Sequence, residues 1–283
     1  MRIDLHSHSS ASDGTQPPAD VVRRARERGL DVLALTDHDT VAGHPAAVEA
    51  LPDGLTLVPG MELSCRRGGQ SIHLLAYLFD PHEPRLLAEC ARIKQAREER
   101  ARVTVERLTE LGVPVTWEQV SSLAAGGAVG RPHIARAMVA AGAIAEPALA
   151  FTPQWIGTGG RAYVTRYALA PDRAVRLVRA AGGVPVLAHP KAAKRGYVVP
   201  DEWIAELAAV GLFGVEADHL DHDAYARQHI RALARDLDLA VTGSSDDHGE
   251  LTGHRLGCET TAPEVYDRMT AEATGAKPIT SQR

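Results

Sequence analysis

Histidines and carboxylates occur in short clusters at five widely separated places in the sequence. Each cluster lies within or directly after a short apolar run of the kind that forms a buried strand. The clusters are His6-Ser7-His8 with Asp13, Thr36-Asp37-His38-Asp39, Glu62, His189-Pro190 and Asp246-Asp247-His248. The two histidines of the first cluster are two residues apart, so they point to the same face of an extended strand. This repeated placement is not expected by chance and predicts a metal site.

The types of these residues indicate which ions would bind and how many. Imidazole and carboxylate without thiolate favour Zn, Mn or Fe. The candidate ligands are His6, His8, Asp13, His38, Glu62, His73, His189, Asp246 and His248. Because a structural ion takes about four ligands and a catalytic ion about three plus water, this set predicts two or three divalent ions with one carboxylate bridging. Three such ions and three carboxylates would leave a charge of about +3, which favours a phosphoryl substrate.

Other polar residues near the clusters have simpler interpretations. Asp37 and Asp39 are expected to orient His38 or neighbouring ligands. His73 lies near the start of its apolar run, so either its strand runs in the opposite sense or the ligand reaches in from a connection, and the sequence leaves both open. The histidines interpreted as surface or hydrogen-bonded groups are His44, His82, His222, His229 and His254.

The elements that must position the ligands are short strands alternating with helices. The apolar runs are residues 3–5, 32–35, 57–63, 72–79, 184–188, 213–215 and 239–241. Between them, helices open at Pro17-Pro18, Pro171 and Pro200 and end at a glycine, which are the usual places for these residues. The pattern predicts an α/β fold, a barrel or a parallel sheet. In α/β barrels the C-terminal ends of the strands build the active site, so ligands far apart in sequence would converge.

The middle of the chain differs because no convincing strand is visible there. Residues 83–111 are predicted to form one long helix ending at Gly112, Thr116 has capping-box spacing to Gln119, and Pro132 starts a further helix. We therefore predict a barrel domain of residues 1–94 and 169–283 that carries a helical insertion, or cap, of residues 95–168.

Composition excludes several other classes of protein. A formal charge of −5 argues against a general nucleic-acid binder, and an aromatic content of 4% argues against stacking platforms for long single strands. The three cysteines form no CxxC pair, so neither a zinc ribbon nor a disulfide framework is indicated. The start has no apolar signal region and no stretch approaches the ~20 apolar residues of a membrane span. The cytoplasm is therefore the expected location, with no membrane partner.

The motifs HSHSSASDG, TDHDT, PGMEL, AHP and GSSDDHG resemble those of the PHP family, named for its polymerase and histidinol-phosphatase members. The resemblance covers about residues 1–80 and 170–260 and implies a distorted seven-stranded β/α barrel. Mapped by motif, it implies one ion held by His6, His8, Glu62 and Asp246, a second held by Glu62, His73 and His189, and a third held by Asp13, His38 and His248. Some members have histidine where this chain has Asp13, a departure that concerns the third ion.

A second motif narrows the resemblance. The run Gly130-Arg131-Pro132-His133, with Phe151 and AGGVPVLAHP, resembles the branch that cleaves 5′-nucleotides, nucleoside 3′,5′-bisphosphates and short RNA 5′ ends. In that branch the insertion covers the barrel mouth, so the resemblance implies that Arg131 and His133 approach the phosphate. A planar guanidinium can bind phosphate oxygens in pairs. His219 follows the sixth apolar run and is placed to touch the substrate.

The expected reaction is hydrolysis of a nucleotide phosphomonoester by metal-activated water. The expected partner is a small phosphorylated nucleotide or a short oligoribonucleotide. Alternatives are a histidinol phosphatase, an exonuclease or phosphodiesterase for short oligonucleotides, a noncatalytic metal-binding accessory domain, and an amidohydrolase. The sequence leaves the native metal, the preferred base and the oligomeric state open.

Overall fold

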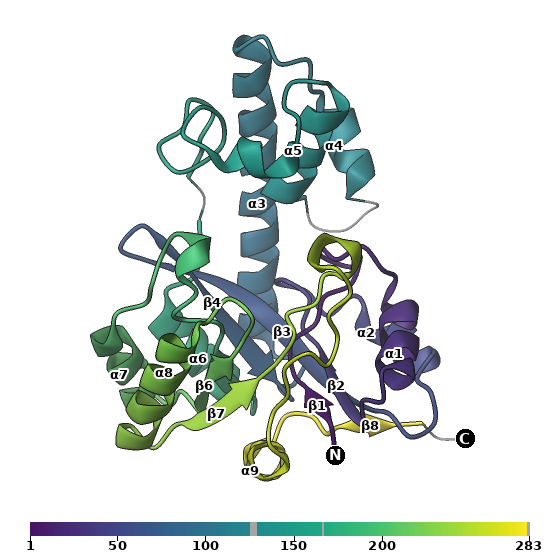
Figure 1. Ribbon diagram of the computed structural model, residues 1–283, viewed down its shortest axis with the longest axis vertical. Helices are drawn as coiled ribbons and strands as arrows, with labels where there is room; N and C mark the ends of the chain where they lie inside the picture. Colours follow the sequence, from purple (N-terminus) through teal and green to yellow (C-terminus); the bar gives the residue numbers. More distant parts are fainter. Residues whose placement is uncertain (125–128, 166, 282–283) are drawn as a thin grey trace. The chain divides into compact units, whose positions relative to one another are not determined.

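The computed structural model describes residues 1–124, 129–165 and 167–281 (Figure 1). The chain divides into two compact units. The first consists of Met1–Cys90 and Leu169–Arg283, and the second of Ala91–Ala168.

The first unit is built on a sheet whose strands follow one another in the order β1 to β7. They are β1 (Ile3–Asp4), β2 (Val32–Leu35), β3 (Thr56–Arg67), β4 (Gln70–Tyr77), β5 (Val184–Leu187), β6 (Gly214–Asp218) and β7 (Ala240–Gly243). Beyond β1 and β7 a parallel bridge joins Ser7 to Asp247, so the sheet is nearly closed into a barrel. This distorted seven-stranded barrel confirms the fold class that the motif resemblance implied, and of the two folds that the apolar runs left open it is the barrel.

One strand of the barrel runs against its neighbours. β1, β2 and β3 are mutually parallel, as are β5, β6 and β7, whereas β4 is antiparallel to both β3 and β5. The start of β4 therefore lies at the barrel end where the parallel strands have their C-termini. His73, near that start, is paired with Ser64 of β3. Of the two alternatives for His73, the structure has the strand of opposite sense.

Helices cover the outside of this barrel. They are α1 (Pro18–Glu27), α2 (His44–Glu49), α6 (Pro171–Ala180), α7 (Asp201–Ala209), α8 (Ala224–Asp236) and α9 (Pro263–Glu272). α1 and α2 lie beside β2, and α6, α7 and α8 flank β5 to β7 (Figure 1). The apolar side chains of these helices hold them on the sheet. α6, for example, buries Ala174, Leu177 and Val178 at helical spacing. A fully buried leucine contributes roughly 1.5–3 kcal/mol.

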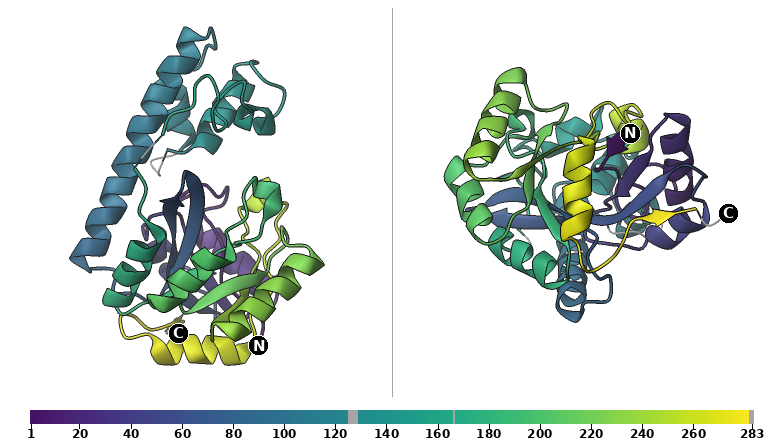
Figure 2. Two further views of the ribbon diagram at one scale, coloured as in Figure 1. Left: turned by 90° about the vertical axis from the view of Figure 1, so that its left-hand side faces the viewer. Right: turned by 90° about the horizontal axis from the view of Figure 1, so that it is seen from below.

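α9 lies across one end of the barrel (Figure 2). Its residue Met269 and the following Ala273 pack in the same buried cluster as Ile3 and Ala240, which stand at the starts of β1 and β7. The helix therefore closes the end at which the parallel strands begin. A short strand, β8 (Ile279–Thr280), then pairs with β3. α9 does not cover the other end of the barrel, where the parallel strands have their C-termini.

The second unit is helical. It contains most of α3 (Pro84–Glu110), then α4 (Trp117–Leu123), α5 (Arg131–Ala140) and the short 3₁₀ helix η1 (Pro147–Phe151). Two further 3₁₀ turns, η2 (Ala193–Arg195) and η3 (Gly249–Thr252), belong to the first unit. At the start of α4, Thr116 and Gln119 make the predicted capping box. The core of the second unit contains Val105, Leu108, Val120, Ile134 and Met138. Between residues 91 and 168, the described part of the chain contains no strand.

Within the described ranges, no helix is both long and apolar enough to cross a bilayer. α3 has the length, with 27 residues, but carries many charged side chains.

Candidate metal centre

The predicted ligands come together at the open end of the barrel. Three groups have ligand atoms within 4.8 Å of one another. They are His6, His8, Glu62 and Asp246; His38, Glu62 and His73; and His8, Asp13, His38 and His248. Each group draws on elements that are distant in the sequence, as the barrel topology requires.

The first group lies around two carboxylates. Oε2 of Glu62 is 3.2 Å from Nε2 of His6 and 3.2 Å from Nε2 of His8. Oδ1 of Asp246 is 3.3 Å from the same two nitrogens. All four residues are at most 1% exposed. This gathering of two imidazoles and two carboxylates is the ligand set that the motif resemblance assigned to one ion.

Glu62 also reaches a second set of histidines. Its Oε1 is 2.8 Å from Nδ1 of His73 and 3.2 Å from Nε2 of His189. Its Oε2 is 3.2 Å from Nδ1 of His38. The two oxygens of this buried carboxylate thus face different imidazoles, which is the arrangement that a bridging ligand between two ions requires.

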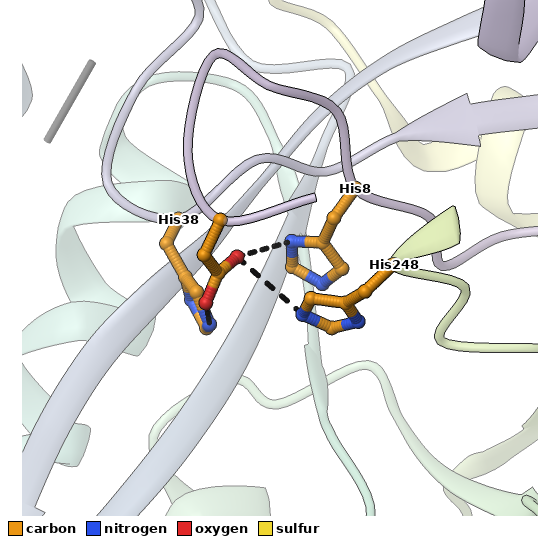
Figure 3. A group of neighbouring side chains, drawn as sticks. His8, His38 and His248 are labelled. Carbon is orange, nitrogen blue, oxygen red and sulfur yellow. Dashed lines mark ion pairs between the residues drawn. The ribbon is translucent and has the colours of Figure 1, made fainter. Parts of the chain in front are cut away.

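The third group brings together His8, His38 and His248 (Figure 3) with Asp13. Oδ1 of Asp13 is 3.7 Å from Nδ1 of His8 and 3.4 Å from Nε2 of His248, and its Oδ2 is 3.7 Å from Nε2 of His38. His8 and His248 are stacked with ring centroids 4.0 Å apart. His8 therefore presents one ring nitrogen to the first group and the other to this one.

The loop that carries Asp13 is held by Asp37. Oδ1 of Asp37 accepts hydrogen bonds from the backbone N of Ser9 (2.8 Å) and the hydroxyl of Ser12 (2.7 Å). Oδ2 accepts one from the hydroxyl of Ser9 (2.6 Å). A Cβ at Gly14 would lie 2.8 Å from the backbone of His8, so the loop can turn this closely only with glycine there. Asp37 thus positions a neighbouring ligand, one of its two expected roles.

Three residues in or beside the ligand groups have a strained backbone. Asp39, His189 and Asp246 have φ values of 55°, 29° and 49°, in a region that residues other than glycine occupy at a cost of about 1–3 kcal/mol each. Asp39 is held there because its N donates to the carbonyl of Glu62 (3.1 Å) and its Oδ1 accepts from the N of Ser64 (2.7 Å). These hydrogen bonds therefore hold Asp39 in a strained backbone conformation that fixes the direction of its side chain.

The residues present fit divalent ions. Nδ1 of His8, His38 and His73 is buried and makes no hydrogen bond to any described residue, although a carboxylate oxygen lies within 3.7 Å of each. Buried polar atoms in proteins almost always have partners. Metal ions between the imidazoles and carboxylates would supply them.

Two histidines of the cluster have pKa values shifted in opposite directions. Burial would lower the pKa of His8, but hydrogen bonds to Asp246 and Glu62 outweigh burial and raise it to about 10. Burial dominates at His38 and lowers its pKa to about 4 despite Glu62 and Asp13. Without ions, His8 is therefore protonated at neutral pH and His38 is neutral.

Metal binding is expected to release protons at pH 8. His8 can coordinate an ion only as the neutral imidazole, and its raised pKa of about 10 means that the proton must leave. Calorimetric titration with Mn²⁺ in buffers of different ionisation enthalpy measures this release. The expected value is about two protons, because the pKa of the ligand His6, despite its burial, is also raised well above its usual range by Asp246, Glu62 and Glu216. The contribution of His8 declines as the pH approaches 10. Proton uptake on binding would contradict the arrangement.

Glu216 is a functional candidate that the sequence analysis did not single out. It is fully buried in β6, and its Oε1 is 3.2 Å from Nδ1 of His6. Burial would raise its pKa, but His6 and His219 lower the pKa to about 2. A lone glutamate inside the apolar run FGVEAD was the available signal, because buried carboxylates are almost always paired.

The three residues predicted to contact substrate lie in different surroundings. His219 is fully buried; its Nε2 is 3.2 Å from Oδ2 of Asp246 and its Nδ1 accepts from the N of Asp221 (3.0 Å). Arg131 and His133 belong to the second unit, at the start of α5. The guanidinium of Arg131 lies 5.6 Å from the ring of Phe151, and Nδ1 of His133 accepts from the N of Gly130 (3.0 Å). Their contact with substrate stays a prediction.

Comparison with known proteins agrees with this site. Residues 4–111 match the family model of the PHP domain. A 5′-3′ exoribonuclease from Haemophilus influenzae is 34% identical over 252 residues, which cover 87% of this chain and 90% of that protein. The chain belongs to the PHP family. A 3′,5′-nucleoside bisphosphate phosphatase from Chromobacterium violaceum is 31% identical over 255 residues, 89% of each protein.

A solved structure extends the likeness to three dimensions. The crystal structure of a protein from Bifidobacterium adolescentis, assigned provisionally as a metal-dependent phosphoesterase, superposes with a TM-score of 0.87 at 32% identity and covers 96% of both chains. This PHP protein is accordingly a hydrolase of phosphoric esters, and its clustered histidines and carboxylates are suited to divalent metals.

Proposed function

We propose that this PHP protein hydrolyses nucleotide phosphomonoesters, with a nucleoside 3′,5′-bisphosphate or a 5′-mononucleotide as substrate. The observation that carries the proposal is the double contact of Glu62, whose two oxygens face different sets of imidazoles. Adjacent ions sharing such a carboxylate suit a phosphoryl group, which presents several anionic oxygens to a small volume. The relatives' names point to nucleotides and RNA.

The proposed chemistry divides between the ions and the chain. Divalent ions in such a site acidify water and offset the negative charge of a phosphoryl group. The chain holds nine ligands in place, as two or three ions require, and Mn, Fe and Zn all suit imidazole and carboxylate donors. Asp246, with the ring of His219 against its Oδ2, is fixed in orientation. The leaving ribose oxygen must gain a proton, and His219 is proposed to donate it.

Arg131 and His133 are proposed as the residues that bind the substrate phosphate. The support is the GRPH motif and the chemistry of guanidinium, whose planar array of donors matches phosphate oxygens. Residues 95–168, which include both side chains, are proposed to form an insertion domain that confers substrate preference.

A second candidate function is removal of nucleotides from the 5′ ends of short RNA. It is favoured by the likeness to the Haemophilus exoribonuclease, at 34% identity. The likeness to the bisphosphate phosphatase is nearly as great, at 31%, so identity alone does not choose between the two substrates.

Phosphate release from several substrates tests the proposal. Mn-loaded protein is given adenosine 3′,5′-bisphosphate, 5′-AMP, a short 5′-phosphorylated RNA and histidinol phosphate. We expect one of the nucleotide substrates to exceed histidinol phosphate at least about 100-fold in kcat/KM, which corresponds to about 2.7 kcal/mol in the transition state. Preference for histidinol phosphate would identify a histidinol phosphatase. Absence of release from protein shown to hold its metals would favour an accessory domain.

The same assay with Arg131→Ala provides the matched comparison. Loss of a charged donor to the transferring group is expected to lower kcat/KM about 100-fold. Arg136→Ala removes an exposed arginine of the same helix and should stay within about twofold of wild type, as surface substitutions usually do. Equal activity of the two variants would remove Arg131 from the substrate site.

A further inference from the structure

Glu216 is a buried carboxylate for which the proposed reaction has no direct use. It stands in β6 with no exposed surface, between β5 and β7 of the barrel. Moving an ionised carboxylate out of water costs several kcal/mol unless it is well paired. The contacts of Glu216 must therefore offset that cost, and they identify what the residue does.

The two oxygens of Glu216 contact two different predicted ligands. Oε1 lies 3.2 Å from Nδ1 of His6 and also accepts a hydrogen bond from the hydroxyl of Ser244. Oε2 accepts a hydrogen bond of 2.8 Å from the backbone N of His189. One side chain thus holds the ring of His6, in the segment after β1, and the backbone of His189, two residues beyond the end of β5.

The contact with His6 fixes which ring nitrogen carries the proton. Nε2 of His6 faces Oε2 of Glu62 at 3.2 Å and Oδ1 of Asp246 at 3.3 Å, so Nε2 is the atom available to an ion. Nδ1 must then be the protonated nitrogen, which donates to Glu216. A carboxylate behind a ligating imidazole orients the ring and makes it a better ligand.

The contact with His189 fixes a strained backbone. His189 has φ of 29°, a conformation that persists only when its surroundings hold it. The hydrogen bond from its N to Glu216 is one such restraint. In this conformation Nε2 of His189 lies 3.2 Å from Oε1 of Glu62, on the side of Glu62 that also faces His73.

We propose that Glu216 is a positioning residue that holds His6 and His189 together and so couples the binding of two ions, one on each side of Glu62. The inference rests on the proposed metal-dependent function. Residues of the third group, Asp13, His38 and His248, make no hydrogen bond or ion pair with Glu216 among the described side chains. A third ion would be linked to the pair only through His8 and His38, which also face Glu62, so it should lose less affinity.

Metal binding by Glu216→Gln, measured without substrate, tests this role. Glutamine keeps the shape but has one acceptor oxygen for two N–H donors, so one of the contacts must fail. Competition between the protein and a chelator for Mn²⁺ should show about 10–100-fold weaker binding of two ions, lost together. The spin-coupled Mn–Mn signal of a bridged pair should disappear with them, while the affinity for any third ion should fall by a smaller factor.

Two further variants separate positioning from a general loss of stability. Glu89→Gln alters another buried carboxylate of the same unit, which pairs with Arg173, and should keep wild-type Mn²⁺ binding. Ser244→Ala keeps the charge of Glu216 but removes one donor to Oε1. It should weaken the binding of the same two ions by a smaller factor, and it tests the role of Glu216 even if Glu216→Gln does not fold.

Three results would overturn the proposal. They are unchanged Mn²⁺ affinity in folded Glu216→Gln, equal weakening of every ion including the third, and an equal effect of Glu89→Gln. Wild-type binding by Ser244→Ala beside an unfolded Glu216→Gln would count against it as well. Because no substrate is used, an error in the substrate assignment leaves the result intact. If the wild-type protein released no phosphate from the proposed substrates, the measured Mn²⁺ affinities would still test the role of Glu216.

Discussion

Glu62→Ala is expected to lower kcat by at least about 1000-fold, equivalent to about 4 kcal/mol in the transition state. Among the described residues, Glu62 is the one carboxylate whose oxygens approach the imidazoles of both His6 and His73, at 3.2 and 2.8 Å. Removing it would take the shared ligand from both ions of the proposed pair at once. The protein should lose the spacing between ions on which in-line displacement at phosphorus depends.

The barrel should survive this change, so the loss can be assigned to the site. In β3, Met61 and Leu63 on either side of Glu62 are buried in the core, and the backbone pairing of Glu62 with Leu75 of β4 does not use the side chain. Far-UV circular dichroism should match wild type. Glu62→Asp, which keeps the charge but shortens the reach, should fall between wild type and alanine. A folded alanine variant within tenfold of wild type would contradict the bridging role.

The strands could be predicted because burial leaves a local record in the sequence. Runs such as residues 32–35 and 184–188 are continuously apolar, as strands covered on both faces must be. The sense of β4 could not be read from its run, because an apolar strand has no intrinsic direction. His73 at its start was the one sign, since its place made sense only for a reversed strand or a connection.

Two helices left little record. α8 buries only Ile230 and Ala234 of its 13 residues, and α9 only Met269 of its ten. Their few buried residues take their positions from the barrel they pack against. β8 has just two residues, too few for any pattern.

The ligands were predictable in type and approximate place, whereas their supporting residues were less so. Histidine at strand ends is unusual enough to stand out, and the barrel topology does the rest. Glu216 meets its partner His6 across 210 residues of sequence. No spacing rule links two such positions, because only the closure of the barrel brings β6 opposite the segment after β1. Contacts of this kind become visible in the structure.

Removal of the metals is expected to abolish phosphate release and to lower the free energy of unfolding. Ligands that bind only the native state stabilise it, by about 4 kcal/mol for one site at a thousandfold excess over Kd. For a barrel unit of this size the change in melting temperature should be roughly 10 °C. Thermal unfolding and phosphate release are measured on protein dialysed against chelator and again after Mn²⁺ is returned.

The two readouts should recover together, because the same side chains serve stability and catalysis. Buried Asp246 and Glu62 lie against imidazoles that ions would separate and neutralise, so the metal-free cluster keeps charges that burial disfavours. Glu62→Ala protein, which lacks the shared ligand, should gain less melting temperature from Mn²⁺ than wild type does. If chelated wild type kept its activity, the histidine cluster would be a structural feature and the catalytic site would lie elsewhere.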